Sequence, residues 1–367
     1  MTNDIKYMKR ALTLARKGIG ATSPNPAVGC VIVKGGMVVG SGWHKKAGLP
    51  HAEINALEMA GDLAQGADLY VTLEPCCHTG KTPPCSQALI RAGVKRVVVG
   101  MGDPNPKVRG GGLAELKAAG IEVICGVLED DCREINRPFI KHVTTGMPFV
   151  TYKCAMTLDG KIATATGASR WISCEDSRTY VHRMRARMDA VMVGVDTIIA
   201  DNPELTVRHV RGRNPLRVVV DTRLRTPESV KVLSGKHAAG TIIATIEANP
   251  RVHLRYLKQG AIVLTCQQDR GRVSMEDLMF KLGSMGVQSI LLEGGGRLAG
   301  NMLENGLIDE FVFFLAPKLL GSDGFSPFNM VGKTSMDQAY KVNISHLGRS
   351  GSDIVVHARP EAICSPD

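Results

Sequence analysis

The chain contains 367 residues, which at roughly 150 residues per domain indicates two or three domains. Its hydrophobic content of 44% and charged content of 22% are typical of a globular protein and exclude a disordered, collagen-like or coiled-coil chain. The net charge of +10 favours a partner that carries phosphate, and an aromatic content of 4% is low for a protein that stacks the bases of single-stranded nucleic acid.

The N-terminal part of the chain is predicted to begin with a helix, because apolar residues from Ile5 to Ala15 recur at helical spacing. A Lys34-Gly35-Gly36 turn between apolar runs at 28–33 and 37–39 predicts a β-hairpin. The further elements expected here are helices at 52–60, 86–92 and 113–119, and strands at 69–73, 96–99 and 122–124. Because helices and strands alternate after the hairpin, we expect a mixed, largely parallel sheet.

A stretch of small residues, 144–148, precedes a new apolar run and marks a domain boundary. We therefore expect two domains, 1–146 and 147–367. In the second, strands are expected at 149–155, 190–194, 216–221, 241–245, 261–264, 289–293, 311–316 and 354–358, and helices at 175–188, 275–285 and 298–305. This domain is also α/β, but its strand-rich last stretch argues against a simple doubly wound sheet.

Targeting features are not expected in this sequence. No apolar run approaches the roughly 18 residues of a membrane helix, and residues 1–20 lack the apolar core of a secretory signal. Ten cysteines are far too few for a disulfide scaffold of this length. We therefore expect a cytoplasmic protein with no membrane partner, in which cysteines at fixed spacings serve a metal or catalytic site.

The strongest motif is His51-Ala52-Glu53, followed by Pro75-Cys76 and Pro84-Cys85. It has the pattern of zinc-dependent base deaminases. One imidazole and two thiolates leave the fourth position of tetrahedral Zn²⁺ open for water, whose pKa the metal lowers towards about 7. We therefore predict His51, Cys76 and Cys85 as ligands of one zinc ion, and Glu53 as the carboxylate that moves protons. Cys77 stays open as an alternative to Cys76.

The spacing of the two cysteines departs from the commonest pattern, in which two residues separate them. Here the segment 77–84 intervenes and adds His78 and Lys81, which suit an anionic group of a substrate. Both His51 and Cys85 stand where helical patterns begin, and a helix N-terminus favours a thiolate.

The second half carries weaker signals. Residues 293–300, Glu-Gly-Gly-Gly-Arg-Leu-Ala-Gly, follow a predicted strand and open a helix, an arrangement that suits a phosphate but also occurs as a plain strand-to-helix turn. Arg178, Arg183, Arg185 and Arg187 lie on one predicted helix and form either a solvated face or, in part, phosphate ligands. Lys153, on the first strand, is either a strand-end charge or a catalytic group.

Taken together, these motifs resemble the bifunctional riboflavin-biosynthesis deaminase/reductase family over nearly the whole chain. The resemblance also rests on Pro24–Gly29, Asp103–Pro106, Thr157–Lys161, Ser169–Ser173 and Gly194–Arg208. It implies a cytidine-deaminase-like three-layer domain with a mixed sheet, followed by a dihydrofolate-reductase-like α/β domain. The implied reactions are hydrolytic deamination of a diaminopyrimidinone ribosylamino 5′-phosphate, and reduction of its ribosyl group to ribityl by NADPH.

The resemblance also implies roles for individual residues. Glu53 and Lys153 are the expected catalytic residues, Lys153 in the reduction. The expected cofactor contacts are Ala155, Trp171, Thr197, Asp201, Thr222, Gly295, Gly296, Arg297, Leu298, Ala299, Gly300 and Asn301. The expected substrate contacts are Asn25, His44, His78, Lys81 and Asp103 in the deaminase, and Ser169, Arg185, Leu205, Arg208 and Glu293 in the reductase. A homodimer is expected from the family as well.

Two other functions fit part of the sequence. A nucleic-acid base deaminase with an RNA-binding second domain fits the zinc motif and the positive charge, but the low aromatic content and evenly spread charge disfavour it, so we expect no nucleic-acid partner. A structural zinc module would need a fourth protein ligand, which Cys77 or His78 would have to supply.

Overall fold

The computed structural model describes residues 3–78, 84–106 and 108–361. The chain divides into two compact units, Met1–Met147 and Pro148–Asp367, which are described one at a time. Among the described residues, no helix has both the length and the apolar character needed to cross a membrane.

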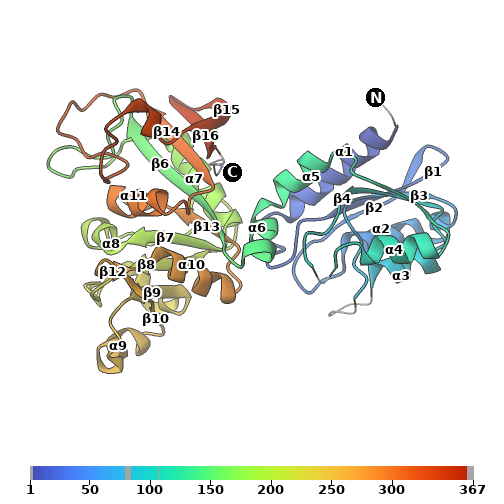
Figure 1. Ribbon diagram of the computed structural model, residues 1–367, viewed down its shortest axis with the longest axis horizontal. Helices are drawn as coiled ribbons and strands as arrows, with labels where there is room; N and C mark the ends of the chain where they lie inside the picture. Colours follow the sequence, from blue (N-terminus) through green and yellow to red (C-terminus); the bar gives the residue numbers. More distant parts are fainter. Residues whose placement is uncertain (1–2, 79–83, 107, 362–367) are drawn as a thin grey trace. The chain divides into compact units, whose positions relative to one another are not determined.

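The first unit is built around a five-stranded sheet of order β2-β1-β3-β4-β5. Strand β1 is antiparallel to both of its neighbours, and β3, β4 and β5 are parallel. Figure 1 shows α1 and α5 on one face of this sheet and α2, α3 and α4 on the other, which makes three layers. The elements are α1 (Asn3–Ala15), β1 (Gly29–Lys34), β2 (Met37–Trp43), α2 (Ala52–Ala60), β3 (Asp68–Leu73), α3 (Cys85–Arg91), β4 (Arg96–Met101), α4 (Gly111–Ala118), β5 (Glu122–Cys125), α5 (Glu129–Ile135) and α6 (Arg137–Thr145).

Helix α2 lies unusually close to strand β2 because two glycines face it. A Cβ atom on Gly40 would come within 2.3 Å of the Ala56 carbonyl oxygen, and one on Gly42 within 2.5 Å of the Ala52 carbonyl oxygen. Only glycine leaves room for this approach. The first turn of α2 is thereby fixed against the sheet.

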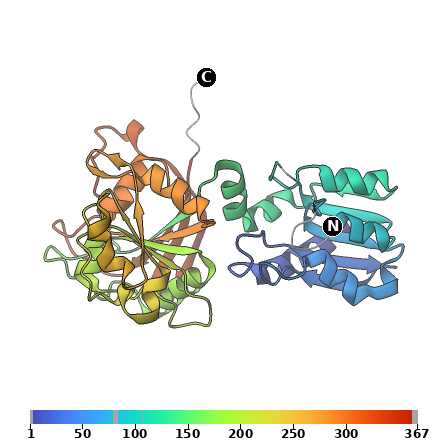
Figure 2. The same ribbon diagram turned by 90° about the horizontal axis from the view of Figure 1, so that it is seen from below.

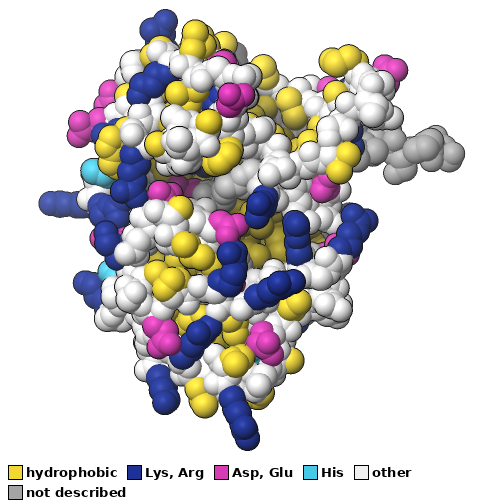
Figure 3. Space-filling view, turned by 90° about the vertical axis from the view of Figure 1, so that its left-hand side faces the viewer, with side chains coloured by type: hydrophobic (Ala, Val, Ile, Leu, Met, Phe, Trp, Pro, Cys, Tyr) yellow, Lys and Arg dark blue, Asp and Glu magenta, His cyan; other side chains and the backbone are white. Residues whose placement is uncertain are grey.

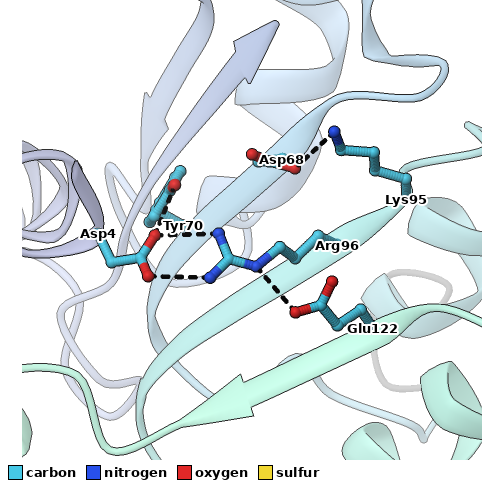
Figure 4. Close-up of polar contacts among 6 residues, drawn as sticks. All are labelled: Asp4, Asp68, Tyr70, Lys95, Arg96 and Glu122. Carbon is cyan, nitrogen blue, oxygen red and sulfur yellow. Dashed lines mark hydrogen bonds and ion pairs between the residues drawn. The ribbon is translucent and has the colours of Figure 1, made fainter. Parts of the chain in front are cut away.

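A polar cluster fastens α1 to the opposite face of the sheet (Figure 4). The Arg96 guanidinium donates to both carboxylate oxygens of Asp4 at 3.0 and 2.9 Å, and the Tyr70 hydroxyl donates to Asp4 at 2.9 Å. The hydrogen bonds from Arg96 hold the pKa of Asp4 below its usual value, against the effect of burial. Arg96 also donates to Glu122 at 3.3 Å, so one guanidinium links α1, β4 and β5.

The second unit contains a nine-stranded sheet of order β10-β9-β8-β7-β13-β6-β14-β16-β15. The strands from β10 to β14 are parallel, and β16 and β15 are antiparallel additions at one edge. Strands β7 and β13 are buried along almost their whole length, so both faces of the sheet are covered, as the helices in Figures 1 and 2 illustrate. The elements are β6 (Phe149–Thr157), α7 (Glu175–Arg187), β7 (Ala190–Gly194), α8 (Val195–Asp201), β8 (Leu216–Val220), β9 (Thr241–Thr245), α9 (Pro250–Leu257), β10 (Ile262–Thr265), β11 (Gln268–Asp269), β12 (Arg272–Val273), α10 (Met275–Ser284), β13 (Ser289–Leu292), α11 (Gly296–Glu304), β14 (Glu310–Ala316), β15 (Val342–Ser350) and β16 (Asp353–Pro360).

The predicted elements are all present, but the sequence analysis missed several others. Helices α5, α6, α8 and α9, each seven to nine residues long, were not predicted. Helix α9 could have been found, because Asn249 caps it and Pro250 opens it. Strand β15 was missed because it is an edge strand that is exposed along most of its length and therefore lacks an apolar pattern.

Candidate functional site

Three predicted ligands converge in the first unit. The ligand atoms of His51, Cys76 and Cys85 all lie within 4.8 Å of one another. The Nδ1 atom of His51 lies 3.3 Å from the Cys85 sulfur and 3.7 Å from the Cys76 sulfur. Such separations are close to the edges of a tetrahedron whose bonds are about 2.0–2.3 Å long, so the donor set fits Zn²⁺.

The chemistry of the two thiols also suits a cation. The Cys76 sulfur accepts hydrogen bonds from Cys85, and these lower the pKa of Cys76 to about 4. The same pairing, with burial, raises the pKa of Cys85 well above its usual value. The thiolate is the form that binds a metal, so the lowered pKa of Cys76 suits a ligand.

Glu53 lies beside this cluster without belonging to it. It follows His51 in the first turn of α2, is only 4% exposed, and is not among the three ligands. Burial is the main reason why its pKa rises to about 7. A carboxyl with a pKa near neutrality can both accept and release a proton, which is what a general acid–base requires.

The second unit contains a large cavity of about 1150 Å³ at the carboxyl ends of its parallel strands. Gly194 and Val220, at the ends of β7 and β8, line it together with Gly295 and Gly296 at the start of α11. Figure 3 shows the hollow from outside, with hydrophobic side chains in its floor and Lys or Arg side chains around its rim. Ligands of open parallel sheets bind at this edge, and the backbone N–H groups that begin α11 suit a phosphate.

Comparison with known proteins connects these two sites. Residues 1–101 match the model of the cytidine and deoxycytidylate deaminase zinc-binding region, and residues 148–356 match that of the RibD C-terminal domain. The riboflavin biosynthesis protein RibD of Actinobacillus pleuropneumoniae is 43% identical over 354 residues, 96% of this chain and 94% of that protein. RibD of Aquifex aeolicus is 44% identical over 96% of this chain and 97% of that protein.

The chain belongs to the RibD family. Form 1 of Acinetobacter baumannii RibD matches its structure with a TM-score of 0.90 and 39% identity, covering 98% of this chain and 99% of that one. A Thermotoga maritima diaminohydroxyphosphoribosylaminopyrimidine deaminase/5-amino-6-(5-phosphoribosylamino)uracil reductase matches with a TM-score of 0.87 and 37% identity, covering 98% and 99%.

As a RibD protein, the chain is a bifunctional enzyme of riboflavin biosynthesis that combines a zinc-dependent deaminase with an NADPH-dependent reductase. The predicted α/β fold, with its cytidine-deaminase-like and reductase domains, is confirmed. The nucleic-acid deaminase is not favoured, because the second unit matches a reductase. A structural zinc module is disfavoured as well, since no fourth His, Cys, Asp or Glu from residues 3–78, 84–106 or 108–361 joins the cluster.

Predicted substrate contacts of the deaminase lie around the three candidate zinc ligands. The Nδ1–H group of His44 donates to the Pro50 carbonyl at 3.1 Å, which leaves Nε2 to accept from the Asn25 amide, also at 3.1 Å. Burial lowers the pKa of His44, so the ring is neutral, and it packs edge-on against His51. Asp103 is buried, with a pKa raised to about 6 chiefly by that burial, and it interacts electrostatically with His78. Lys81 lies outside the described residues.

Several of the predicted cofactor contacts lie at one cavity. Thr197, Thr222, Gly295, Gly296, Arg297, Leu298 and Asn301 line the cavity of the RibD reductase unit. Ala155, Trp171, Asp201, Ala299 and Gly300 lie outside its lining. Ala299 and Gly300 are buried on the inner side of α11, and Asp201 instead pairs with Arg170, whose guanidinium nitrogen lies 3.6 Å from the Asp201 carboxylate.

The predicted substrate residues of the reductase separate into two groups. Arg185 and Glu293 form a buried, bidentate ion pair with N–O distances of 2.6 and 2.9 Å, and Lys153 contributes to lowering the pKa of Glu293. Leu205 is buried and directly precedes Thr206, whose carbonyl accepts a hydrogen bond from Arg185 at 3.1 Å. In the second group, Arg208 is exposed and pairs with Glu204, and Ser169 is half-buried in the loop that follows β6.

Glu74 is a residue of the deaminase site that the sequence analysis did not assign. Its buried carboxylate accepts backbone N–H groups from Asp103 and Gly110 at 3.1 Å on one oxygen, and from Gly112 at 3.1 Å and Leu113 at 3.4 Å on the other. Glu74 thus joins the strand end that leads into Cys76 to the loop that carries Asp103. Its place directly before Pro75-Cys76 was the available signal.

We expect Glu74→Gln to destabilise this loop. The Gln amide would present N–H groups to two of the four backbone donors, and each buried polar group left unpaired costs about 1–3 kcal/mol. Thermal unfolding of the first unit should begin at a lower temperature and kcat/KM for deamination should fall. Reduction of the preformed deaminated compound by the same variant is the internal control, and unchanged unfolding and deamination would contradict the assignment.

Proposed function

We propose that the chain first deaminates 2,5-diamino-6-(5-phosphoribosylamino)pyrimidin-4-one and then reduces the ribosyl side chain of the product to ribityl with NADPH. The observation that carries the first step is the convergence of His51, Cys76 and Cys85 beside the buried carboxyl of Glu53. The similar protein of Thermotoga maritima is named for both reactions together. The residue roles below are part of this proposal.

In the deaminase, His51, Cys76 and Cys85 hold the zinc ion, which when bound supplies a Lewis acid that makes water nucleophilic at neutral pH. Glu53 accepts a proton from the water that adds to the amine-bearing ring carbon and delivers it to the leaving amine. One C–N bond breaks, one C–O bond forms, and ammonia leaves. Neutral His44 and Asn25 stay in fixed orientation beside His51, where they can hold the ring of the substrate.

In the reductase, the cavity lined by Thr197, Thr222 and the glycine loop holds NADPH, and the substrate binds near Glu293 and Lys153. The cofactor supplies the hydride, so the task of the protein is to orient it and to provide the electrostatic environment. Burial alone would raise the pKa of Glu293, but the charge and hydrogen bonds of Arg185 hold it below its usual value. Glu293 is therefore a fixed anion, with Lys153 as its neighbouring cation.

We expect Arg185→Ala to destabilise the reductase unit and to raise its Michaelis constant. Both side chains of the pair are only 11% exposed, and removal of one partner from a buried ion pair costs about 3–5 kcal/mol because the other charge stays uncompensated. Denaturant unfolding, monitored through the loss of reductase activity, measures the change in stability. Arg183→Ala, an exposed arginine on the same helix, is the matched control. Equal denaturation midpoints for the two variants would contradict the stabilising role of Arg185. Deamination should be unaffected in both variants.

A coupled assay tests the function as a whole. The zinc-loaded full chain is given the diaminopyrimidinone with NADPH, and ammonia and nicotinamide absorbance are followed together. Release of ammonia, followed by NADPH oxidation that depends on it, is the expected result. Ammonia without NADPH oxidation would contradict the proposed reductase, and NADPH oxidation without ammonia would contradict the proposed order.

We also propose that the enzyme acts in the cytoplasm as a homodimer. The cysteines that the structure describes are all free, as in a reducing compartment. The edge strand β15 exposes Ile344 and Leu347 to 65% and 67%, beside unpaired backbone groups that a second copy could cover. The molar mass in solution tests the assembly.

A further inference from the structure

One end of the reductase cavity is formed by a short hairpin that neither the sequence analysis nor the comparisons assign to a function. Strands β11 and β12 pair Gln268 with Val273 and Asp269 with Arg272, so Arg270 and Gly271 form a two-residue turn. Both turn residues have positive φ values, 47° and 74°, as a tight type I′ hairpin requires. Val273 is buried and anchors the hairpin. Arg270, Gly271, Arg272 and Val273 all line the cavity.

Of the described arginines that line the cavity, some are paired with a carboxylate and others are not. Asp196 lies 2.6 Å from Arg225 and 3.6 Å from Arg297, so one carboxylate engages both of these lining guanidinium groups. Arg223, Arg270 and Arg272 also line the cavity and are exposed, and none of the ion pairs found in the described part of the chain includes them. This end of the cavity therefore carries an excess of positive charge, which favours a dianion.

The position of this charge within the sheet indicates which group it binds. Arg223 follows Thr222 at the end of β8, and both residues line the same cavity as the hairpin. In the sheet order, β7 separates β8 from β13, the strand that leads into the glycine loop and the start of α11. The end of β8 therefore lies two strand spacings, about 10 Å, from the end of β13. A pyrophosphate at the start of α11 would thus place the adenosine end of the cofactor, with its ribose, at the hairpin.

We propose that Arg270 and Arg272 of the hairpin, together with Arg223, bind the 2′-phosphate of NADPH and so select it over NADH. This inference rests on the proposed placement of the cofactor. The 5′-phosphate of the substrate is a less suitable occupant, since Ser169, Arg185, Arg208 and Glu293 all lie outside the lining of this cavity. Guanidinium groups suit the role because their planar donors match phosphate oxygens.

Binding of adenosine fragments to the full chain tests the proposal without turnover. Calorimetry with adenosine 2′,5′-bisphosphate and with AMP compares ligands that differ by the 2′-phosphate alone. For the double variant Arg270→Gln/Arg272→Gln, we expect the Kd of the bisphosphate to rise about 10- to 100-fold, as loss of charge-assisted hydrogen bonds predicts, while the Kd of AMP stays unchanged. Arg223→Gln should act in the same direction. Binding of the bisphosphate by the wild type should weaken with salt more steeply than binding by the double variant.

Arg251→Gln is the matched control, because Arg251 is an exposed arginine on α9 outside the cavity lining. Equal weakening of AMP and of the bisphosphate would overturn the proposal and assign the hairpin to the adenosine instead. Unchanged affinity for the bisphosphate in the double variant would overturn it as well. Failure of the wild type to bind either NADPH or NADH would instead contradict the proposed function, so the two failures can be distinguished.

Discussion

Replacement of Glu53 by Gln is expected to abolish ammonia release while zinc stays bound. The side chain is 4% exposed and lies next to the three ligands without joining them, so the isosteric amide should keep the packing and the metal site. The amide cannot accept and return a proton at neutral pH. Loss of a general acid–base group lowers rates by about 10²- to 10⁴-fold.

Two measurements on this variant separate catalysis from metal binding. Metal analysis should give the same zinc content as the wild type, and the ammonia assay should give the loss of rate. Glu58→Gln is the matched control, since Glu58 is an exposed glutamate on the same helix α2. Loss of zinc from Glu53→Gln would show that Glu53 is a ligand, and full activity would remove it from the reaction. Reduction of the deaminated compound should be unchanged.

Replacement of Cys76 by Ser is expected to remove zinc and deaminase activity together, whereas Cys77→Ser should keep both. The Cys76 sulfur faces His51 Nδ1 at 3.7 Å and accepts a hydrogen bond from the Cys85 backbone N–H at 3.4 Å. The Cys77 sulfur instead lies 4.0 Å from the Val108 carbonyl oxygen and packs against Gly111. The two sulfurs thus have different surroundings, and we expect only the Cys76 thiol to bind the metal.

Zinc content after exhaustive dialysis, measured on both variants in parallel, decides between the two thiols. A hydroxyl is a poor zinc ligand compared with a thiolate, so the Cys76 variant should lose most of its metal. The Cys77 variant serves as the control for a change of sulfur to oxygen at the adjacent position. The reverse outcome would exchange the roles of the two cysteines.

The sequence by itself was sufficient to predict the fold class and to single out the three side chains that converge at the candidate zinc site. His51 and Glu53 are two residues apart, and Cys76 and Cys85 each follow a proline, so the signal is local in the chain. Most of the longer helices and buried strands were also predictable, because burial on one or both faces imposes an apolar period. The edge strand β15 lacks such a period, because it is exposed along most of its length.

Only the tertiary structure decided how distant residues pair. Arg185 and Glu293 are 108 positions apart, and the fold pairs them with each other, which no local pattern indicated. The carboxylate of Glu74 reaches backbone groups as far along the chain as Leu113, and the β11–β12 hairpin meets the glycine loop at one cavity. Such contacts depend on sheet order and on the direction of each side chain. Neither has a local signature, since one chain pattern is compatible with many strand orders, and only burial and hydrogen bonding across the completed sheet select among them.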